Sequence, residues 1–144
     1  MRIIKLESGE KFSSTIILIR LMVGVVFLSE GIQKFLFPVT RGAGRFITIG
    51  LPIPEVLSYI VASFEVICGT LILIGLITSI ASLPLIIIML VAIVSTKIPI
   101  MLQDGFWQVA HAARTDFSMF LGATFLFLNG GGKYSLDNYF KKNR

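Results

Sequence analysis

The sequence contains few of the side chains on which most redox and metal enzymes depend. Among its 144 residues there is one cysteine, Cys68, and one histidine, His111. A single cysteine excludes an intramolecular disulfide and a Cys-x-x-Cys pair. A single histidine excludes bis-histidine haem ligation and a histidine-rich metal site within one chain. We therefore expect no metal site and no intrinsic cofactor.

Charge is also scarce, and apolar residues take its place. Charged residues make up 15% of the chain, against roughly 25% in soluble domains. Hydrophobic residues make up 55%, and the mean hydropathy is +0.88. A soluble protein of this size could not bury so much apolar surface, whereas a bilayer protein need not. Because the net charge of +5 comes mostly from the termini, we expect membrane lipid, and not nucleic acid, as a partner.

Four apolar segments reach the roughly 20 residues that a helix needs to span a bilayer. They cover residues 14–37, 55–77, 78–98 and 113–129. The second and third are joined almost directly, which predicts a tight helical hairpin. The first and third connections, "RGAGRFITIGLPIP" and "MLQDGFWQVAHAA", resemble short interfacial or re-entrant helices. The sequence thus predicts an all-α, integral membrane, four-transmembrane-helix bundle that forms a single domain over residues 1–144.

The distribution of basic residues predicts the orientation of this bundle. An even number of spans places both termini on one side of the membrane. That side would carry seven basic residues, Arg2, Lys5, Lys11, Lys133, Lys141, Lys142 and Arg144. The other side would carry Lys34, Arg41, Arg45, Lys97 and Arg114. By the positive-inside rule we expect cytoplasmic termini, with the tail "KYSLDNYFKKNR" along the interface.

Three ionisable residues interrupt the first apolar segment. At about 100° per residue, Arg20 and Lys34 share one stripe with Gly24 and Gly31, and Glu30 flanks it. An unpaired ionised residue costs about 2.5 to 3.5 kcal/mol at mid-membrane, and glycines allow a neighbouring helix to approach closely. We therefore expect the stripe to face the bundle interior, with Glu30 and Lys34 paired at i, i+4.

A fourth charge, Glu65, is predicted close to the bilayer midplane. It lies about 15 Å from either end of the second segment, so its carboxyl group must be paired or protonated. We expect Arg20 to be its partner. Asp116, close in depth to Arg114 and Lys97, should join the cluster of Glu30 and Lys34.

These observations leave structural alternatives open. Intramembrane ion pairs can serve only to fix helix register. Cys68 can be a small packing residue and not a redox thiol, and His111 can be a surface hydrogen-bonding residue and not a site residue. The candidate ligand-binding or buried polar cluster consists of Arg20, Glu30, Lys34, Glu65, Arg114 and Asp116.

Three stretches in order resemble the DoxX family of small bacterial membrane proteins. They are "RLMVGVVFLSEGIQKF", "GLPIPEVLSYIVASFEVICGTLILIGL" and "HAARTDFSMFLGATFLFLNGGGKYSLD". The residues that match the family pattern are Arg20, Gly24, Gly31, Lys34, Gly50-Leu51-Pro52, Glu65, Gly69, Gly75, Arg114-Thr115-Asp116 and Ser135-Leu136-Asp137. The resemblance extends over most of the chain, from Arg20 to Asp137.

The resemblance implies a four-helix protein of the cytoplasmic membrane, and it connects the chain with redox chemistry. Some relatives are subunits of a thiosulfate:quinone oxidoreductase, and others are linked to membrane redox complexes or to resistance against thiol and quinone stress. We therefore expect a quinone- or thiol-stress-linked subunit, with quinone as the candidate ligand and redox proteins as candidate partners. Two alternatives are a small proton-coupled exporter that uses Glu65 and a non-catalytic scaffold. Catalytic activity and homo-oligomerisation stay open.

Overall fold

The regular structure of the described chain is entirely α-helical. The computed structural model describes the backbone of residues 2–143 and the side chains of residues 13–143. Within that part there are six helices and no strand: α1 (Arg2–Leu36), α2 (Ala43–Thr48), α3 (Pro54–Ile74), α4 (Thr78–Asp104), α5 (Phe106–Asn129) and α6 (Leu136–Lys142). The predicted all-α class is confirmed for these residues. The side chains of Arg2, Lys5, Lys11 and Arg144, which contribute to the predicted orientation, lie outside the described set.

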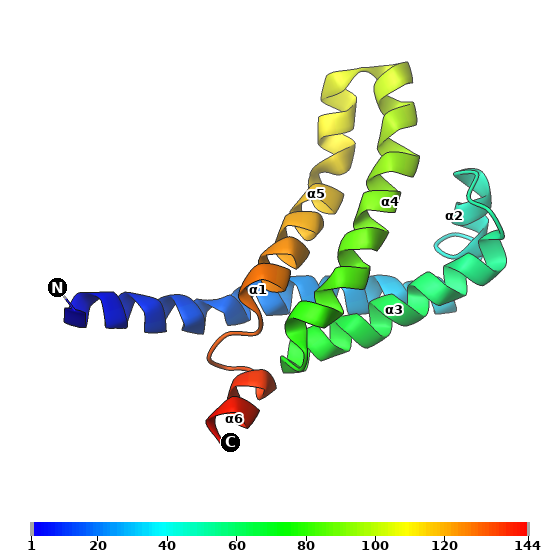
Figure 1. Ribbon diagram of the computed structural model, residues 1–144. Helices are drawn as coiled ribbons and strands as arrows, with labels where there is room; N and C mark the ends of the chain where they lie inside the picture. Colours follow the sequence, from blue (N-terminus) through cyan, green and yellow to red (C-terminus); the bar gives the residue numbers. More distant parts are fainter. Residues whose placement is uncertain (1, 144) are drawn as a thin grey trace.

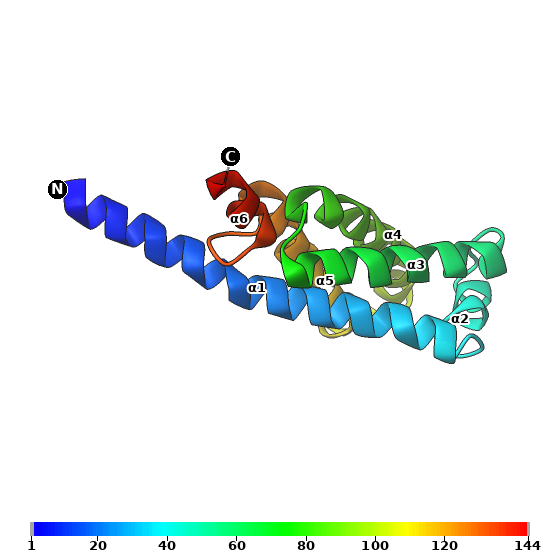
Figure 2. The same ribbon diagram turned by 90° about the horizontal axis from the view of Figure 1, so that it is seen from below.

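The four long helices form two antiparallel pairs. Helix α1 packs along α3, and α4 packs along α5. Figure 1 shows that the two pairs diverge from the α3–α4 hairpin, so that α4 and α5 rise away from the plane of α1 and α3. Figure 2 shows the same arrangement from below, with α2 near the end of α1 that is remote from the termini. The helices therefore do not form one parallel bundle along their whole length.

Three of the four predicted spans meet the length and composition of a membrane helix. Within the described residues these are Ser13–Leu36, Pro54–Ile74 and Thr78–Asp104. Helix α5 has 24 residues, but Gln108, His111, Arg114 and Asp116 interrupt its first half. Only its second half is predominantly apolar. Helix α5 is therefore long enough for a membrane span, but it is less apolar than the three segments named above.

The two connections predicted to carry short helices differ. The first does contain one, α2, as expected. The prediction of a separate short helix in the third connection is wrong: α4 continues to Asp104, Gly105 alone forms the turn, and α5 begins at Phe106. Gly105 has a φ of 83°, a conformation that glycine adopts readily. The residues expected to lie at the interface simply extend α4 and α5.

Close contact between α1 and α3 depends on glycines, as the sequence predicted. A Cβ atom at Gly31 would lie 2.8 Å from the carbonyl oxygen of Ala62. A Cβ atom at Gly69 would lie 2.8 Å from the backbone nitrogen of Leu28. Both neighbours are backbone atoms, which cannot move without displacing a helix. The small residues thus set the helix separation, which places the long side chains of α1 against α3.

Arg20 joins the C-terminal end of α3 to the segment that follows α5. Its side chain is buried, with a relative exposure of 2%. Nε donates to the carbonyl of Ile72 at 2.9 Å and Nη2 to that of Leu73 at 2.6 Å. Nη1 donates to the carbonyls of Gly131, at 3.3 Å, and Tyr134. The last carbonyls of a helix lack intrahelical donors and carry its negative dipole end, so a planar cation with five donors suits this position.

The expected pairing of Arg20 with Glu65 is therefore wrong. Glu65 and Ile72 are seven residues apart on α3, about 10 Å along the helix axis. Arg20 lies at the level of Ile72, and its hydrogen bonds are all made to carbonyl groups there.

Asp137 completes this junction from the other side. Its carboxylate accepts from the backbone N–H groups of Ile77, at 2.7 Å, and Thr78, at 3.0 Å. These two N–H groups lie at the start of α4, where the first four N–H groups of a helix lack intrahelical partners. The backbone N–H of Asp137 donates to the carbonyl of Gly75 at 3.0 Å. The tight α3–α4 hairpin is thus confirmed, and it is held by residues from both α1 and the C-terminal segment.

We expect Arg20→Met to destabilise the protein strongly, because it leaves buried carbonyls without donors. Hydrogen bonds to charged groups contribute about 1.5 to 3 kcal/mol each, so the thermal unfolding midpoint in detergent should fall by about 5 °C or more. Asp137→Asn keeps one acceptor oxygen and should lower the unfolding midpoint less. An Arg20→Met variant with an unchanged midpoint would contradict this role.

Candidate functional site

A cavity of about 350 Å³ opens between the two helix pairs, and residues of α1 to α5 line it. Most of its wall is apolar, with Phe27, Leu57, Val61, Ile87 and Met119 among the lining residues. Six ionisable side chains also line it: Glu30, Lys34, Arg41, Arg45, Glu65 and Asp116. Four of the six predicted cluster residues are therefore brought together in one cavity.

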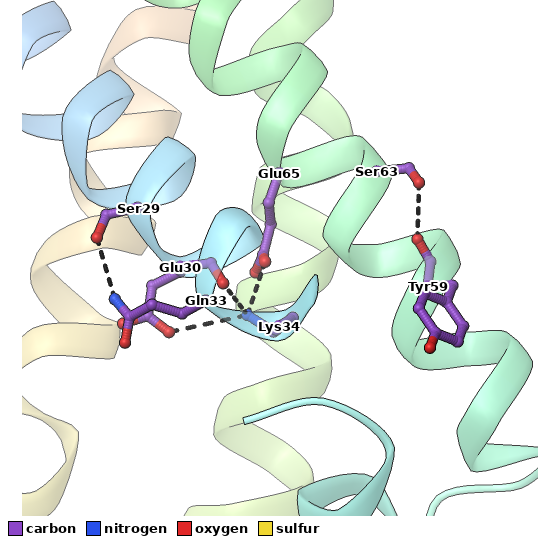
Figure 3. Close-up of polar contacts among 7 residues, drawn as sticks. All are labelled: Ser29, Glu30, Gln33, Lys34, Tyr59, Ser63 and Glu65. Carbon is purple, nitrogen blue, oxygen red and sulfur yellow. Dashed lines mark hydrogen bonds and ion pairs between the residues drawn. The ribbon is translucent and has the colours of Figure 1, made fainter. Parts of the chain in front are cut away.

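Lys34 connects the two carboxylates of the cavity floor. Its Nζ lies 2.6 Å from Oε2 of Glu65 and 3.8 Å from Oε2 of Glu30. Figure 3 shows the ammonium group between the two acids, which come from α1 and α3. The Glu65 side chain is 3% exposed and that of Lys34 11%, whereas Glu30 is 43% exposed. The predicted Glu30–Lys34 contact is thus present, and the partner that Glu65 requires is Lys34.

The helix geometry explains why Lys34 reaches the middle of α3. Helices α1 and α3 are antiparallel, and Gly31 contacts the backbone of Ala62. Lys34 lies about one turn further along α1, and its four-carbon side chain extends back to Glu65. The ion pair at 2.6 Å offsets a desolvation that would be unfavourable for either charge alone.

A second ion pair lies on the α4–α5 side of the cavity. Lys97 Nζ lies 2.8 Å from Oδ2 of Asp116. Asp116 lines the same cavity as Glu30 and Lys34, as the sequence predicted, but its direct partner is Lys97. Arg114 is not among the lining residues. It is exposed, and its Nη1 lies 3.0 Å and 2.8 Å from the two ring nitrogens of His111.

Two arginines that line the cavity were not among the predicted site residues. Arg41 lies in the turn that follows α1, and Arg45 lies in α2. Both are exposed, and neither has an ion-pair or hydrogen-bond partner for its side chain in the described part of the chain. The sequence does contain a signal, the i, i+4 spacing of the two arginines in "RGAGR". Only their charges, and not their spacing, enter the predicted membrane orientation.

Cys68 and His111 lie apart from this cavity. Cys68 is 5% exposed and belongs to the hydrophobic core, and its thiol is free. His111 is exposed on α5. No group of three or more His, Cys, Asp or Glu side chains within the described residues is placed to hold a metal ion. The cavity can therefore offer hydrogen bonds and charge to an amphipathic molecule, against an apolar wall.

We expect Lys34→Met to destabilise the protein by about 3 to 5 kcal/mol, because it leaves the Glu65 carboxylate buried and unpaired. The double variant Lys34→Met/Glu65→Leu should recover most of this loss, since both charges are then removed. Glu30→Gln is the control, and at a half-exposed site it should cost less than about 1 kcal/mol. Unfolding in detergent measures all three, and equal losses in Lys34→Met and Glu30→Gln would refute the pairing.

Comparison with known proteins supports a membrane protein. The sequence profile of the DoxX family matches residues 15–98. The chain is 48% identical over 134 residues, 89% of its length and 82% of the relative's, to a protein named "Uncharacterized membrane protein" from Mycobacterium tuberculosis (strain ATCC 25618 / H37Rv). It is 26% identical over 137 residues, 94% of each chain, to "Putative oxidoreductase CatD" of Bacillus subtilis (strain 168). No solved structure matches the chain.

The family profile includes α2, α3 and most of the apolar parts of α1 and α4. It therefore contains Glu30, Lys34, Arg41, Arg45 and Glu65, five of the six ionisable residues of the cavity. The resemblance seen in the sequence is confirmed, and the chain belongs to the DoxX family of membrane proteins.

Proposed function

We propose that the protein is a ligand-binding subunit of a membrane redox complex, and that its cavity takes a quinone. The observation that carries the proposal is the Lys34–Glu65 ion pair in the mostly apolar wall of a cavity of about 350 Å³. A quinone needs an apolar slot for its ring and a few donors for its carbonyl oxygens. Lys34 lines the cavity and carries such donors.

The electrons would pass to or from a partner protein. One cysteine and one histidine cannot form a dithiol pair or a bis-histidine haem site within one chain. The chain would therefore bind the quinone and dock the protein that carries out electron transfer. The name of the Bacillus subtilis relative, "Putative oxidoreductase CatD", supports a redox setting. A role in quinone or thiol stress follows if the ligand is a reactive quinone.

A proton-coupled exporter is the alternative that uses the same residues. Glu65 would be its coupling group, since buried membrane carboxylates often serve as proton relays. The ion pair with Lys34 and the two arginines of the cavity speak against it, because they would repel a lipophilic cation. Proton-driven efflux from vesicles that is abolished by Glu65→Gln would favour the exporter. A non-catalytic scaffold would retain its function when the cavity charges are neutralised.

In this proposal α5 forms the fourth span, with both termini in the cytoplasm of the bacterial cell. At about 1.5 Å per residue, its 24 residues are long enough to cross the hydrocarbon core. Its polar first half faces α4 through the Lys97–Asp116 pair, which reduces the exposure of charge to lipid.

This topology predicts opposite labelling of two single-cysteine variants. In a Cys68→Ala background, Gln108→Cys lies at the start of α5, and Asn143→Cys lies beyond α6. A membrane-impermeant maleimide should label the first in intact cells and the second only after permeabilisation. Labelling of both variants in intact cells would exclude a fourth span with cytoplasmic termini.

We expect Val61→Trp to weaken quinone binding by about ten-fold or more, because the indole would fill the cavity that Val61 lines and lost contacts of about 1.4 kcal/mol correspond to a ten-fold change. Ile67→Trp is the matched control, since Ile67 lies on the same helix and is 57% exposed. Titration of short-chain benzoquinones and naphthoquinones into purified, delipidated protein measures the effect. Equal affinities in the two variants, or no binding by the unmodified protein, would contradict the proposal.

A further inference from the structure

The charges that line the cavity are not distributed evenly. Each carboxylate there contacts an ammonium group: Glu30 and Glu65 contact Lys34, and Asp116 contacts Lys97. The guanidinium groups of Arg41 and Arg45 have no such partner among the described residues. The three carboxylates share two ammonium groups and so keep a net charge of −1 between them, whereas the two guanidinium groups make no ion pair within the described part of the chain.

The two cations lie at one end of the site. Arg41 and Arg45 are in the segment that joins α1 to α3, directly beyond the apolar stretch that ends at Leu36. Beyond the end of a membrane span lie the lipid headgroups. Both side chains are exposed, yet both also line the cavity. An anion held by them would lie at headgroup depth and touch the cavity mouth.

Apolar side chains continue from the arginines into the cavity. Phe46, the buried residue of α2, lies next to Arg45 in sequence and lines the cavity together with Ile49, Leu51 and Leu57. This wall meets Val61 further along α3. The mouth thus combines two unpaired guanidinium groups with an adjoining hydrocarbon surface, which is the combination that an anionic amphiphile requires.

We propose that the mouth of the cavity is a binding site for an anionic membrane phospholipid, with Arg41 and Arg45 on the phosphate and the upper acyl chain against Phe46 and Leu57. Guanidinium groups bind phosphate oxygens in bidentate fashion. A cavity of about 350 Å³ holds only part of a phospholipid, so the remaining chain stays in the bilayer. An anionic lipid suits the two arginines better than the alternatives do. A neutral quinone has no negative charge to pair with them, and in a zwitterionic headgroup the phosphate already has a cation beside it.

This inference goes beyond the proposed function and does not depend on it. The quinone would use the interior beside Lys34, whereas the lipid phosphate would use the mouth. The two proposals are tested separately, because quinone binding is measured without phospholipid and lipid preference is measured without quinone.

The test compares binding of phosphatidylglycerol and phosphatidylcholine to the purified full-length protein by native mass spectrometry. The unmodified protein should prefer phosphatidylglycerol by about ten-fold or more, since a single charge-assisted contact corresponds to about that factor. Arg41→Gln/Arg45→Gln should abolish most of this preference. Arg41→Lys/Arg45→Lys, which keeps the charge but loses the bidentate geometry, should retain part of it.

Two matched controls locate the effect. Arg114→Gln removes an exposed arginine that does not line the cavity. Lys141→Gln/Lys142→Gln removes two basic residues of α6, which also attract anionic lipid. Both controls should keep the preference. Equal binding of the two lipids by the unmodified protein, or loss of the preference only in the α6 variant, would overturn the proposal.

Discussion

The ion pair of Lys34 and Glu65 places two opposite charges between apolar helices, and the geometry of the site depends on it. Among the described side chains, the only other ionisable partner of either residue is Glu30, whose Oε2 is 3.8 Å from Nζ of Lys34. The pair can form only because Gly31 and Gly69 let the backbones of α1 and α3 touch. Helix contact and charge compensation are thus one constraint: a wider separation would leave a buried carboxylate unpaired.

The two cations of α1 show why lysine and arginine are not equivalent in this protein. Arg20 donates to four carbonyl groups from two separate segments, which requires a planar group with several donors. Lys34 concentrates its charge at one atom that lies between two carboxylates. One cation therefore fastens helix ends, and the other compensates acids. Both residues lie on the same stripe of α1, but Arg20 stabilises the junction between helices, whereas Lys34 lines the cavity.

The sequence is enough to identify the charged stripe of α1, but not to tell that Arg20 belongs to the helix junction and Lys34 to the cavity. Helical periodicity placed Arg20 and Lys34 on one inward face, and i, i+4 spacing predicted the Glu30–Lys34 contact. It assigned Glu65 to the wrong cation, because partner choice depends on how far α3 is shifted along α1, which no local pattern encodes. Arg41 and Arg45 were missed as cavity residues because a short helix expected in this connection can lie at the interface or fold back, and local spacing does not tell which side chains would then reach a cavity. The sequence predicts a third span that ends at residue 98, whereas α4 continues through Pro99 to Asp104.

The cavity follows from the divergence of the two helix pairs. Had α4 and α5 packed along the whole of α1 and α3, apolar side chains would fill this space. Instead, the pairs are joined closely near Arg20 and Asp137 and separate towards α2. The ionisable residues are concentrated where the pairs separate, since only there can water or a polar ligand group reach them. The proposed binding of an amphipathic molecule rests on these two features together, a junction at one end and an open, charged cavity at the other.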